Sequence, residues 1–110
     1  KVPEKGNFDC VRWDPTPVDA AHHPESAFGA IGMFGNGWEW TSTPFAALPG
    51  FKRFEFYKGY SADFFDGRHF VMKGGSPRTA ACMVRPAFRN WFQAHYQYAY
   101  AGFRCVTAIA

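Results

Sequence analysis

The chain has 110 residues, a length that suits one domain at most. Its net charge of +3 is modest and its basic residues are spread out, so nucleic-acid binding is not indicated. No apolar run approaches the roughly 20 residues that a membrane-spanning helix needs. Thirteen Phe, five Tyr and four Trp predict an aromatic core, and eleven Gly with eight Pro predict a loop-rich α+β fold with short strands.

The first third of the chain is expected to be irregular. Residues 1–6 lack any helix-capping pattern, and residues 7–13 form a short predicted strand that ends at the Pro-containing residues 14–17. Residues 18–24 have the composition of an exposed loop. Residues 27–34 are small and apolar, which predicts a close-packed helical turn or a buried connector.

Residues 35–41, Gly-Asn-Gly-Trp-Glu-Trp-Thr, form the motif around which the rest of the chain is organised. The Asn-Gly pair predicts a turn, because both residues tolerate positive φ. In the extended segment that follows, Trp38 and Trp40 share one face and Glu39 lies on the other. This pattern favours a core strand after a turn. An alternative is that the oxygens of Asn36 and Glu39, with nearby carbonyls, bind a hard cation such as calcium.

The second half of the chain alternates turns with short predicted strands. Residues 62–67 end in an Asp-Gly turn, and residues 69–73 form a predicted strand. The Gly-Gly-Ser-Pro run at 74–77 predicts a backbone kink where another segment can approach closely. Residues 93–100 are predicted to be an aromatic, polar loop, and residues 101–106 a final strand.

The cysteines and histidines do not predict a metal site in this chain. Cys10, Cys82 and Cys105 have no Cys-x-x-Cys spacing, so zinc is not expected. One disulfide with a leftover thiol stays open, but three reduced, mostly buried cysteines are favoured, as in a cytoplasmic protein. His69 has neither a carboxylate nor a second histidine at a ligand-like spacing, and all four histidines are expected to be surface or structural residues.

Three motifs occur in a fixed order: Gly-Asn-Gly-Trp-Glu-Trp-Thr at 35–41, Lys-Gly-Gly-Ser at 73–76 and Ala-Gly-Phe-Arg-Cys at 101–105. In this order they resemble the formylglycine-generating-enzyme (sulfatase-modifying factor) superfamily, a variant of the C-type lectin fold. The resemblance covers nearly the whole chain. It implies an α+β, C-type-lectin-like formylglycine-generating-enzyme fold that is loop-rich and has short antiparallel strands.

Three further stretches narrow the resemblance. Residues 60–67, 72–82 and 88–92 are similar to the C-terminal domain of ergothioneine-biosynthesis sulfoxide synthases, also called hercynine oxygenases. Family members that make formylglycine carry two copper-binding cysteines soon after the Gly-Gly-Ser motif. Thr79 and Val84 stand at those positions here, which speaks against formylglycine chemistry.

The family resemblance also implies that residues 1–110 are the C-terminal portion of a longer enzyme. The first half of the family domain and the N-terminal helical domain have no counterpart in this sequence. In such enzymes, an iron(II) held by three histidines of that helical domain reacts with dioxygen, a thiol and hercynine, which is Nα-trimethylhistidine. Sulfur is joined to the imidazole C2 and oxidised to a sulfoxide. The expected task of this chain is to wall the site and orient the substrates.

The imidazole and the carboxylate of hercynine require polar partners. An imidazole nitrogen takes an amide, and Asn90 matches the asparagine of the family's Arg-Asn-Trp motif. A guanidinium from Arg85 or Arg89 suits the carboxylate. Asn90 ranks first among these candidates. The structural alternatives stay open, because Asn90 also suits a turn cap and Arg89 a tie between loops.

The trimethylammonium group is best held by aromatic faces, at about 0.5–2 kcal/mol per contact. The candidates are Trp91, Phe92, Tyr96 and Tyr98, although for Trp91 and Phe92 a place in the core is favoured. In the branch that uses γ-glutamylcysteine, an Asp and an Arg stand two and six residues after the motif asparagine. Phe92 and Tyr96 occupy those positions here, which predicts free cysteine as the thiol donor.

Two other interpretations compete with the enzymatic one. Some proteins of this fold are non-enzymatic ligand-binding modules, including the variable proteins of diversity-generating retroelements, and residues 93–100 suit such a binding surface. Alternatively, the chain is a fragment that folds only as half of a domain. In that case residues 1–110 expressed alone are expected to be poorly stable, because aromatic surface is left uncovered.

Overall fold

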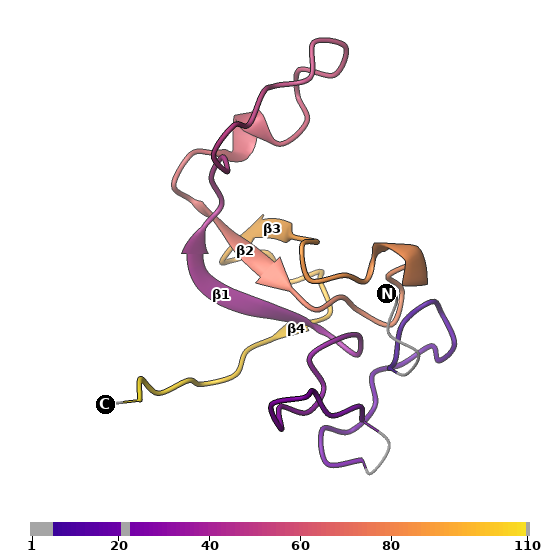
Figure 1. The fold of residues 1–110 in the computed structure, drawn as a ribbon. Helices are drawn as coiled ribbons and strands as arrows, with labels where there is room; N and C mark the ends of the chain where they lie inside the picture. Colours follow the sequence, from indigo (N-terminus) through magenta and orange to yellow (C-terminus); the bar gives the residue numbers. More distant parts are fainter. Residues whose placement is uncertain (1–5, 21–22, 110) are drawn as a thin grey trace.

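The computed structural model describes residues 6–20 and 23–109. This part of the chain is mainly loops around a small curled sheet (Figure 1). Its elements are β1 (Trp38–Pro44), the 3-10 helix η1 (Ala62–Phe64), β2 (His69–Lys73), the 3-10 helix η2 (Ala81–Met83), β3 (Asn90–Gln93) and β4 (Ala101–Gly102). No helix within these ranges is long and apolar enough to cross a membrane.

The sheet is mixed, in the order β3-β2-β1-β4. The pairs β1–β2 and β2–β3 are antiparallel, as expected from the sequence. The expectation of antiparallel strands is wrong for β4, which pairs with β1 in parallel through Trp38 with Ala101 and Glu39 with Gly102. A parallel neighbour requires a long connection, and here residues 45–100 supply it.

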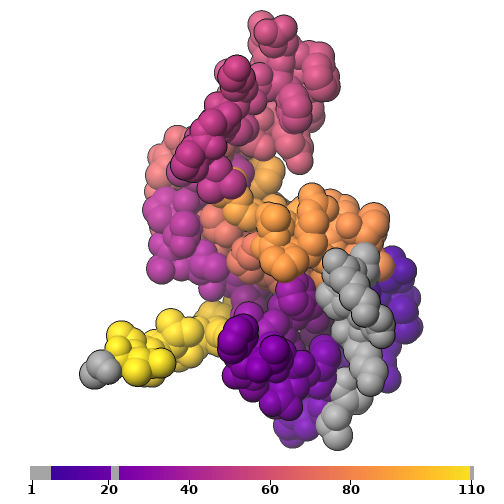
Figure 2. All heavy atoms as spheres, viewed as in Figure 1, coloured from indigo at the N-terminus to yellow at the C-terminus, as the bar shows by residue number. Residues whose placement is uncertain are grey.

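The core is small and lies along the central strands. Met72 and Val71 of β2 are buried, together with Trp38 of β1 and Phe45 just after it. Aromatic rings form much of this core, as the composition predicts. Many others are exposed, however, and residues 46–60 project from the body as a separate aromatic-rich lobe (Figure 2).

The predicted turn and kink of the central motifs are confirmed. Asn36 has a φ of 66°, in the left-handed region, directly before β1. The Gly35 amide donates to the Gly74 carbonyl at 3.0 Å, so the first two motifs meet at their glycines. A Cβ on Gly35 would lie 2.6 Å from the carbonyl oxygen of Asn7, which is closer than any side chain tolerates.

Three segments differ from their predicted structure. Residues 7–13 form turns and bends, because Asp9 and Cys10 have φ values of 61° and 56° that an extended strand cannot contain. Residues 27–34 are an exposed turn and not a buried connector, with Phe28 97% exposed. The last strand, predicted over 101–106, ends at Gly102 because the chain then leaves the sheet.

The strand β3 has half-buried side chains on both faces, so its residues show no alternation of buried and exposed positions. One further sequence interpretation needs correction. Cys10, Cys82 and Cys105 are free, as expected, but all three are exposed and not mostly buried. The cytoplasmic prediction assumed buried thiols, so the exposure of these three cysteines removes that support.

Candidate functional site

The strand β3 divides the predicted substrate-binding residues between two faces of the sheet. In the antiparallel register, Asn90 lies opposite Met72 and Trp91 opposite Val71. Directly opposed residues share a face, and successive residues alternate. Asn90 and Phe92 therefore lie on one face of β3, and Trp91 lies on the other.

Asn90 is half-buried at the start of β3. Its side-chain Oδ1 accepts a hydrogen bond of 2.9 Å from the backbone N–H of Trp91. This bond fixes the amide plane. Its Nδ2 donates to no other residue within 6–20 and 23–109. Asn90 is thus not sealed in the interior, and its Oδ1 makes a local contact with the backbone, as the structural alternative predicts.

The Trp91 face is a packed aromatic cluster. The Trp91 ring stacks on Phe45 with centroids 4.2 Å apart and planes at 4°, and it also contacts Tyr60 and Phe64. The Arg89 guanidinium lies 5.0 Å from the Phe45 ring centroid and donates to the Ala46 carbonyl at 3.4 Å. These contacts match the structural alternatives for Trp91 and Arg89.

The Asn90 face carries a more open aromatic group. Phe92 and Tyr96 stack with centroids 4.0 Å apart and planes at 1°, and Tyr98 meets Tyr96 edge-on at 5.5 Å. Arg85 is exposed and its guanidinium lies 5.8 Å from the Phe88 ring centroid. The structure therefore brings Phe92, Tyr96 and Tyr98 together and separates them from Trp91.

Lys73 holds the segment that leads into β3. Its Nζ donates to the carbonyls of Phe88, at 2.8 Å, and Pro86. Burial lowers the pKa of Lys73, and the positive charge of Arg89 lowers it further. Because both carbonyls lie within four residues before Asn90, the lysine anchors the segment that enters β3.

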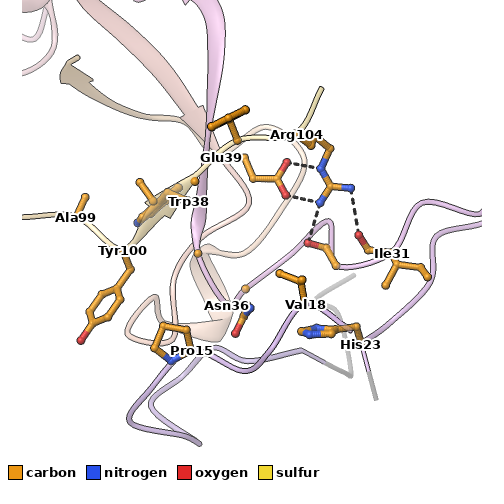
Figure 3. A pocket seen from close by; sticks show the side chains of 16 residues that line it. Pro15, Val18, His23, Ile31, Asn36, Trp38, Glu39, Ala99, Tyr100 and Arg104 are labelled. Carbon is orange, nitrogen blue, oxygen red and sulfur yellow. Dashed lines mark hydrogen bonds and ion pairs between the residues drawn. The ribbon is translucent and has the colours of Figure 1, made fainter. Parts of the chain in front are cut away.

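A cavity of about 650 Å³ lies elsewhere, between the first loops and the C-terminal segment (Figure 3). Asn36, Trp38 and Glu39 line it together with Tyr100 and Arg104. None of the six residues predicted to bind substrate lines this cavity. Those residues are Arg85, Arg89, Asn90, Trp91, Phe92 and Tyr96.

The predicted calcium ligands at this cavity are bound to protein donors. The Oδ1 of Asn36 accepts from the Thr16 N–H at 2.6 Å and from the Asn7 Nδ2 at 3.1 Å. The Glu39 carboxylate is bidentate to Arg104, through Nε at 2.6 Å and through Nη2. The Glu39 hydrogen bond raises the pKa of Arg104 despite some burial. This geometry gives the calcium prediction no support, because the oxygens of both side chains already accept hydrogen bonds from protein donors.

Two side-chain pairings in the structure were not predicted from the sequence. Glu39 and Arg104 are 65 positions apart, and only their places in the first and third motifs indicated a link. His69 was assigned no carboxylate partner, yet its Nδ1 lies 2.9 Å from Asp66 Oδ1. The three-residue spacing across the Asp-Gly turn was the available signal for that pair.

Comparison with known proteins agrees with the three ordered motifs. Residues 8–109 match the Sulfatase-modifying factor enzyme 1-like domain. The chain is 40% identical over 104 residues to Ergothioneine biosynthesis protein 1 of Neurospora crassa, which covers 91% of this chain and 11% of the relative. It is 41% identical over 90 residues to Hercynine oxygenase of Mycobacterium tuberculosis, covering 82% of this chain and 21% of the relative. It is 43% identical over 100 residues to Hercynine oxygenase of Mycolicibacterium thermoresistibile, which covers 87% of this chain and 22% of the relative.

The ordered motifs and the small curled sheet define a domain of the C-type-lectin-like class. Within that class, the chain belongs to the Sulfatase-modifying factor enzyme 1-like domain family, which confirms the resemblance. The chain spans between 11% and 22% of the length of these three relatives.

Proposed function

We propose that residues 1–110 are the C-terminal, substrate-binding portion of an oxygen-dependent sulfoxide synthase of ergothioneine biosynthesis. The observation that carries the proposal is the identity of 40–43% to proteins named for hercynine oxygenation and ergothioneine biosynthesis. The oriented amide of Asn90 supports it. In this proposal the enzyme is cytoplasmic, and its small-molecule substrates are hercynine, a thiol and dioxygen.

Iron(II) is the proposed cofactor, and its ligands belong to another part of the enzyme. The described residues do not fit an iron site, because no three His, Cys, Asp or Glu side chains within 6–20 and 23–109 are grouped to hold a metal. When bound by the rest of the enzyme, iron supplies the activation of dioxygen. The role proposed for this chain is limited to binding and orienting the organic substrates.

Asn90 is the proposed partner of the hercynine imidazole. Its Oδ1 is held by the Trp91 N–H, so its Nδ2 points in a fixed direction and donates to an unprotonated imidazole nitrogen. Such preorganisation lowers the barrier, because the ring is not free to rotate away from the reacting sulfur. The adjacent Phe92, Tyr96 and Tyr98 rings supply π faces for the trimethylammonium group.

Arg85 is the favoured partner of the hercynine carboxylate. Arg89 contacts Phe45 and Ala46 on the opposite face of β3 from Asn90. Arg85 is exposed and forms no ion pair within the described ranges, so its N–H groups are available for a bidentate carboxylate. This proposal therefore ranks Arg85 above Arg89, which the sequence left level.

Free cysteine is the proposed thiol donor. The Phe92 and Tyr96 side chains stack on each other and supply no charge to bind the carboxylate and ammonium groups of the glutamyl part of γ-glutamylcysteine. Burying those charges without partners would be unfavourable.

Steady-state assays of the intact enzyme with hercynine and each thiol test both parts of the proposal. We expect sulfoxide formation with cysteine at a kcat/KM at least about 10-fold above that with the dipeptide, equivalent to about 1.4 kcal/mol. A strong preference for γ-glutamylcysteine refutes the thiol assignment only. No sulfoxide with either thiol refutes the enzymatic function.

A non-enzymatic ligand-binding module is the second candidate. The exposure of the 94–98 loop, which carries Tyr96 and Tyr98, favours it, since exposed tyrosines suit a binding surface. The adjacent coding sequence discriminates between the two. An in-frame helical domain with a His-x3-His-x-Glu type motif supports the enzyme, whereas a neighbouring reverse transcriptase supports the binding module.

A further inference from the structure

The ladder between β2 and β3 ends at the residue proposed to bind the hercynine imidazole. Its register runs from His69 opposite Gln93 to Met72 opposite Asn90, so Asn90 is the last paired residue at that end. The strand β3 has four residues and lies at the edge of the sheet, with β2 as its neighbour in the described part of the chain. The end of a short edge strand frays readily. The backbone of Asn90 therefore needs support from beyond the ladder if its side chain is to keep one orientation.

Lys73 supplies that support one residue beyond the ladder. It follows Met72 at the end of β2, and its Nζ donates to the carbonyls of Phe88, at 2.8 Å, and Pro86. In Figure 1 the segment between η2 and β3 runs beside the end of β2, which is where these bonds form. Hydrogen bonds from an ammonium group are roughly twice as strong as neutral ones. One side chain thus replaces the backbone ladder with two strong bonds.

The segment that Lys73 holds is also fixed at other points. The Phe88 N–H donates to the Arg85 carbonyl at 3.0 Å, which closes a turn over residues 85–88. The Phe88 ring lies 5.6 Å from the ring of Trp38 on β1. The Lys73 bonds attach this turn to β2 as well. Only one residue separates Phe88 from Asn90, so a displacement of the Phe88 carbonyl moves the backbone of Asn90.

We propose that Lys73 is a positioning residue, which holds Asn90 in place for hercynine through the backbone of residues 86–89. The inference rests on the proposed function, and it adds a residue of β2 to the proposed binding residues, all of which lie between positions 85 and 98. Without the two bonds from Lys73, the start of β3 is free to shift. A misplacement of about 1 Å can cost an enzyme about 100-fold in rate, so a small shift of the Asn90 amide is sufficient to matter.

Steady-state kinetics of the intact enzyme separate positioning from general structural support. Lys73→Met keeps the aliphatic stem and removes the N–H donors. We expect the KM for hercynine to rise at least about 10-fold, while the KM for free cysteine changes less than about 2-fold. A purely structural role would lower the fraction of active enzyme, and with it kcat, and would leave the KM for hercynine unchanged.

Two matched variants control this measurement. Lys73→Arg keeps N–H donors on a long side chain and should return the KM for hercynine to within about 3-fold of the wild-type value. Lys52→Met removes the same charge at an exposed position on the 46–60 lobe and should match the wild type. A loss in Lys52→Met equal to that in Lys73→Met would overturn the inference, because the effect would then follow from charge alone.

A double substitution tests whether Lys73 acts through Asn90. Residues that act as a unit have non-additive effects on catalysis. In the Asn90→Ala background, Lys73→Met should lower kcat/KM for hercynine by less than about 3-fold, compared with at least about 10-fold in the wild-type background. Additive losses would overturn the inference.

Hydrogen exchange followed by mass spectrometry gives a readout that does not need activity. In intact Lys73→Met, the amides of residues 88–93 should exchange at least about 10-fold faster than in the wild type, while those of β1 stay unchanged. Equal exchange at residues 88–93 in both proteins would overturn the inference. Lys73→Gln, whose shorter side chain cannot reach both carbonyls, decides the same points if Lys73→Met does not fold. A wild-type enzyme that forms no sulfoxide refutes the proposed function, whereas the exchange result still decides whether Lys73 holds β3.

Discussion

Asn90 and Trp91 are adjacent in the sequence, yet their side chains lie on opposite faces of β3. The Trp91 ring completes the stack on Phe45, and its backbone N–H holds the Asn90 amide. Packing on one face thereby fixes a polar group on the other. The two residues should consequently respond differently to substitution, and this difference separates a binding role from a structural one.

Asn90→Ala should impair activity more than stability. Removing the proposed hydrogen bond to substrate costs about 1.5–3 kcal/mol, so kcat/KM for hercynine in the intact enzyme should fall about 10- to 100-fold. The free energy of unfolding should fall by only about 0.5–1.5 kcal/mol, because the variant loses the Oδ1 bond to the Trp91 N–H and Nδ2 supports no other described residue. Gln93→Ala, at the end of the same strand, is the control and should retain activity. Equal losses of activity in both variants would contradict a binding role for Asn90.

Trp91→Ala should lower the free energy of unfolding by about 3 kcal/mol, at the lower end for aromatic truncation because the ring is half-buried. The loss follows from emptying the space between Phe45, Phe64 and Tyr60. Urea denaturation measures it. Trp13→Ala is the matched control, since Trp13 is 70% exposed, and should cost less than about 1 kcal/mol. A Trp91→Ala protein as stable as the control would show that the ring is not a core residue.

The sequence predicted those parts of the fold that local chemistry decides. Asn36 and the glycines near it set turns through their φ preferences, and β2 has a short apolar run between turn residues. The parallel pairing of β4 could not be predicted, because it depends on a return of the chain after residues 45–100. The face of the sheet on which each β3 side chain lies could not be predicted either, because all four residues are half-buried and give no periodic signal.

The candidate site residues stay a prediction from the sequence. The family motif pointed to Asn90, and Phe92 and Tyr96 were aromatic candidates; Asn90 and Phe92 lie in the edge strand β3, and Tyr96 stacks on Phe92. The sequence alone does not distinguish Arg85 from Arg89 as a partner for the carboxylate. Their different ring contacts in the structure do, because Arg89 lies over Phe45 and Arg85 over Phe88. The low stability expected for residues 1–110 expressed alone stays a prediction.

The ion pair of Glu39 and Arg104 should couple the first and third motifs energetically. Both side chains are partly exposed, so solvent screens the interaction and a coupling of about 1 kcal/mol is expected. A double-mutant cycle with Glu39→Gln and Arg104→Gln, read by urea denaturation, measures it. The coupling should shrink in about 1 M salt, where the screening length is about 3 Å. Additive losses in the double variant would mean that the pair contributes nothing beyond its separate contacts.

Calcium should leave stability unchanged. Protein stripped of metal with chelator and then given 1 mM calcium chloride, about 100-fold above a dissociation constant of 10 μM, would gain about 2.7 kcal/mol if a site existed. We expect no gain, because Asn36 and Glu39 are bound to Thr16 and Arg104. Glu39→Gln is treated in parallel. A rise in melting temperature for the wild type that Glu39→Gln lacks would restore the calcium assignment.

Asp66 should make stability fall with acid. Its carboxylate accepts hydrogen bonds from His69 Nδ1 and from the Arg68 N–H, both at 2.9 Å, and these bonds, His69 first, hold the pKa of Asp66 below its ordinary value of 3.8. With a lowered folded pKa, the unfolded chain binds more protons as the pH drops. The contribution is therefore fully present above the unfolded pKa, and it is lost as pH falls through the folded pKa.

Between about pH 5 and pH 2, the free energy of unfolding of the wild type should decline more steeply than that of Asp66→Asn, which has no carboxylate to protonate. Urea denaturation at successive pH values measures both slopes. Asp19→Asn, an exposed substitution in the first loops, should follow the wild-type curve. Parallel curves for wild type and Asp66→Asn would show that the Asp66 to His69 contact does not persist in solution, and that the turn before β2 is held by its backbone alone.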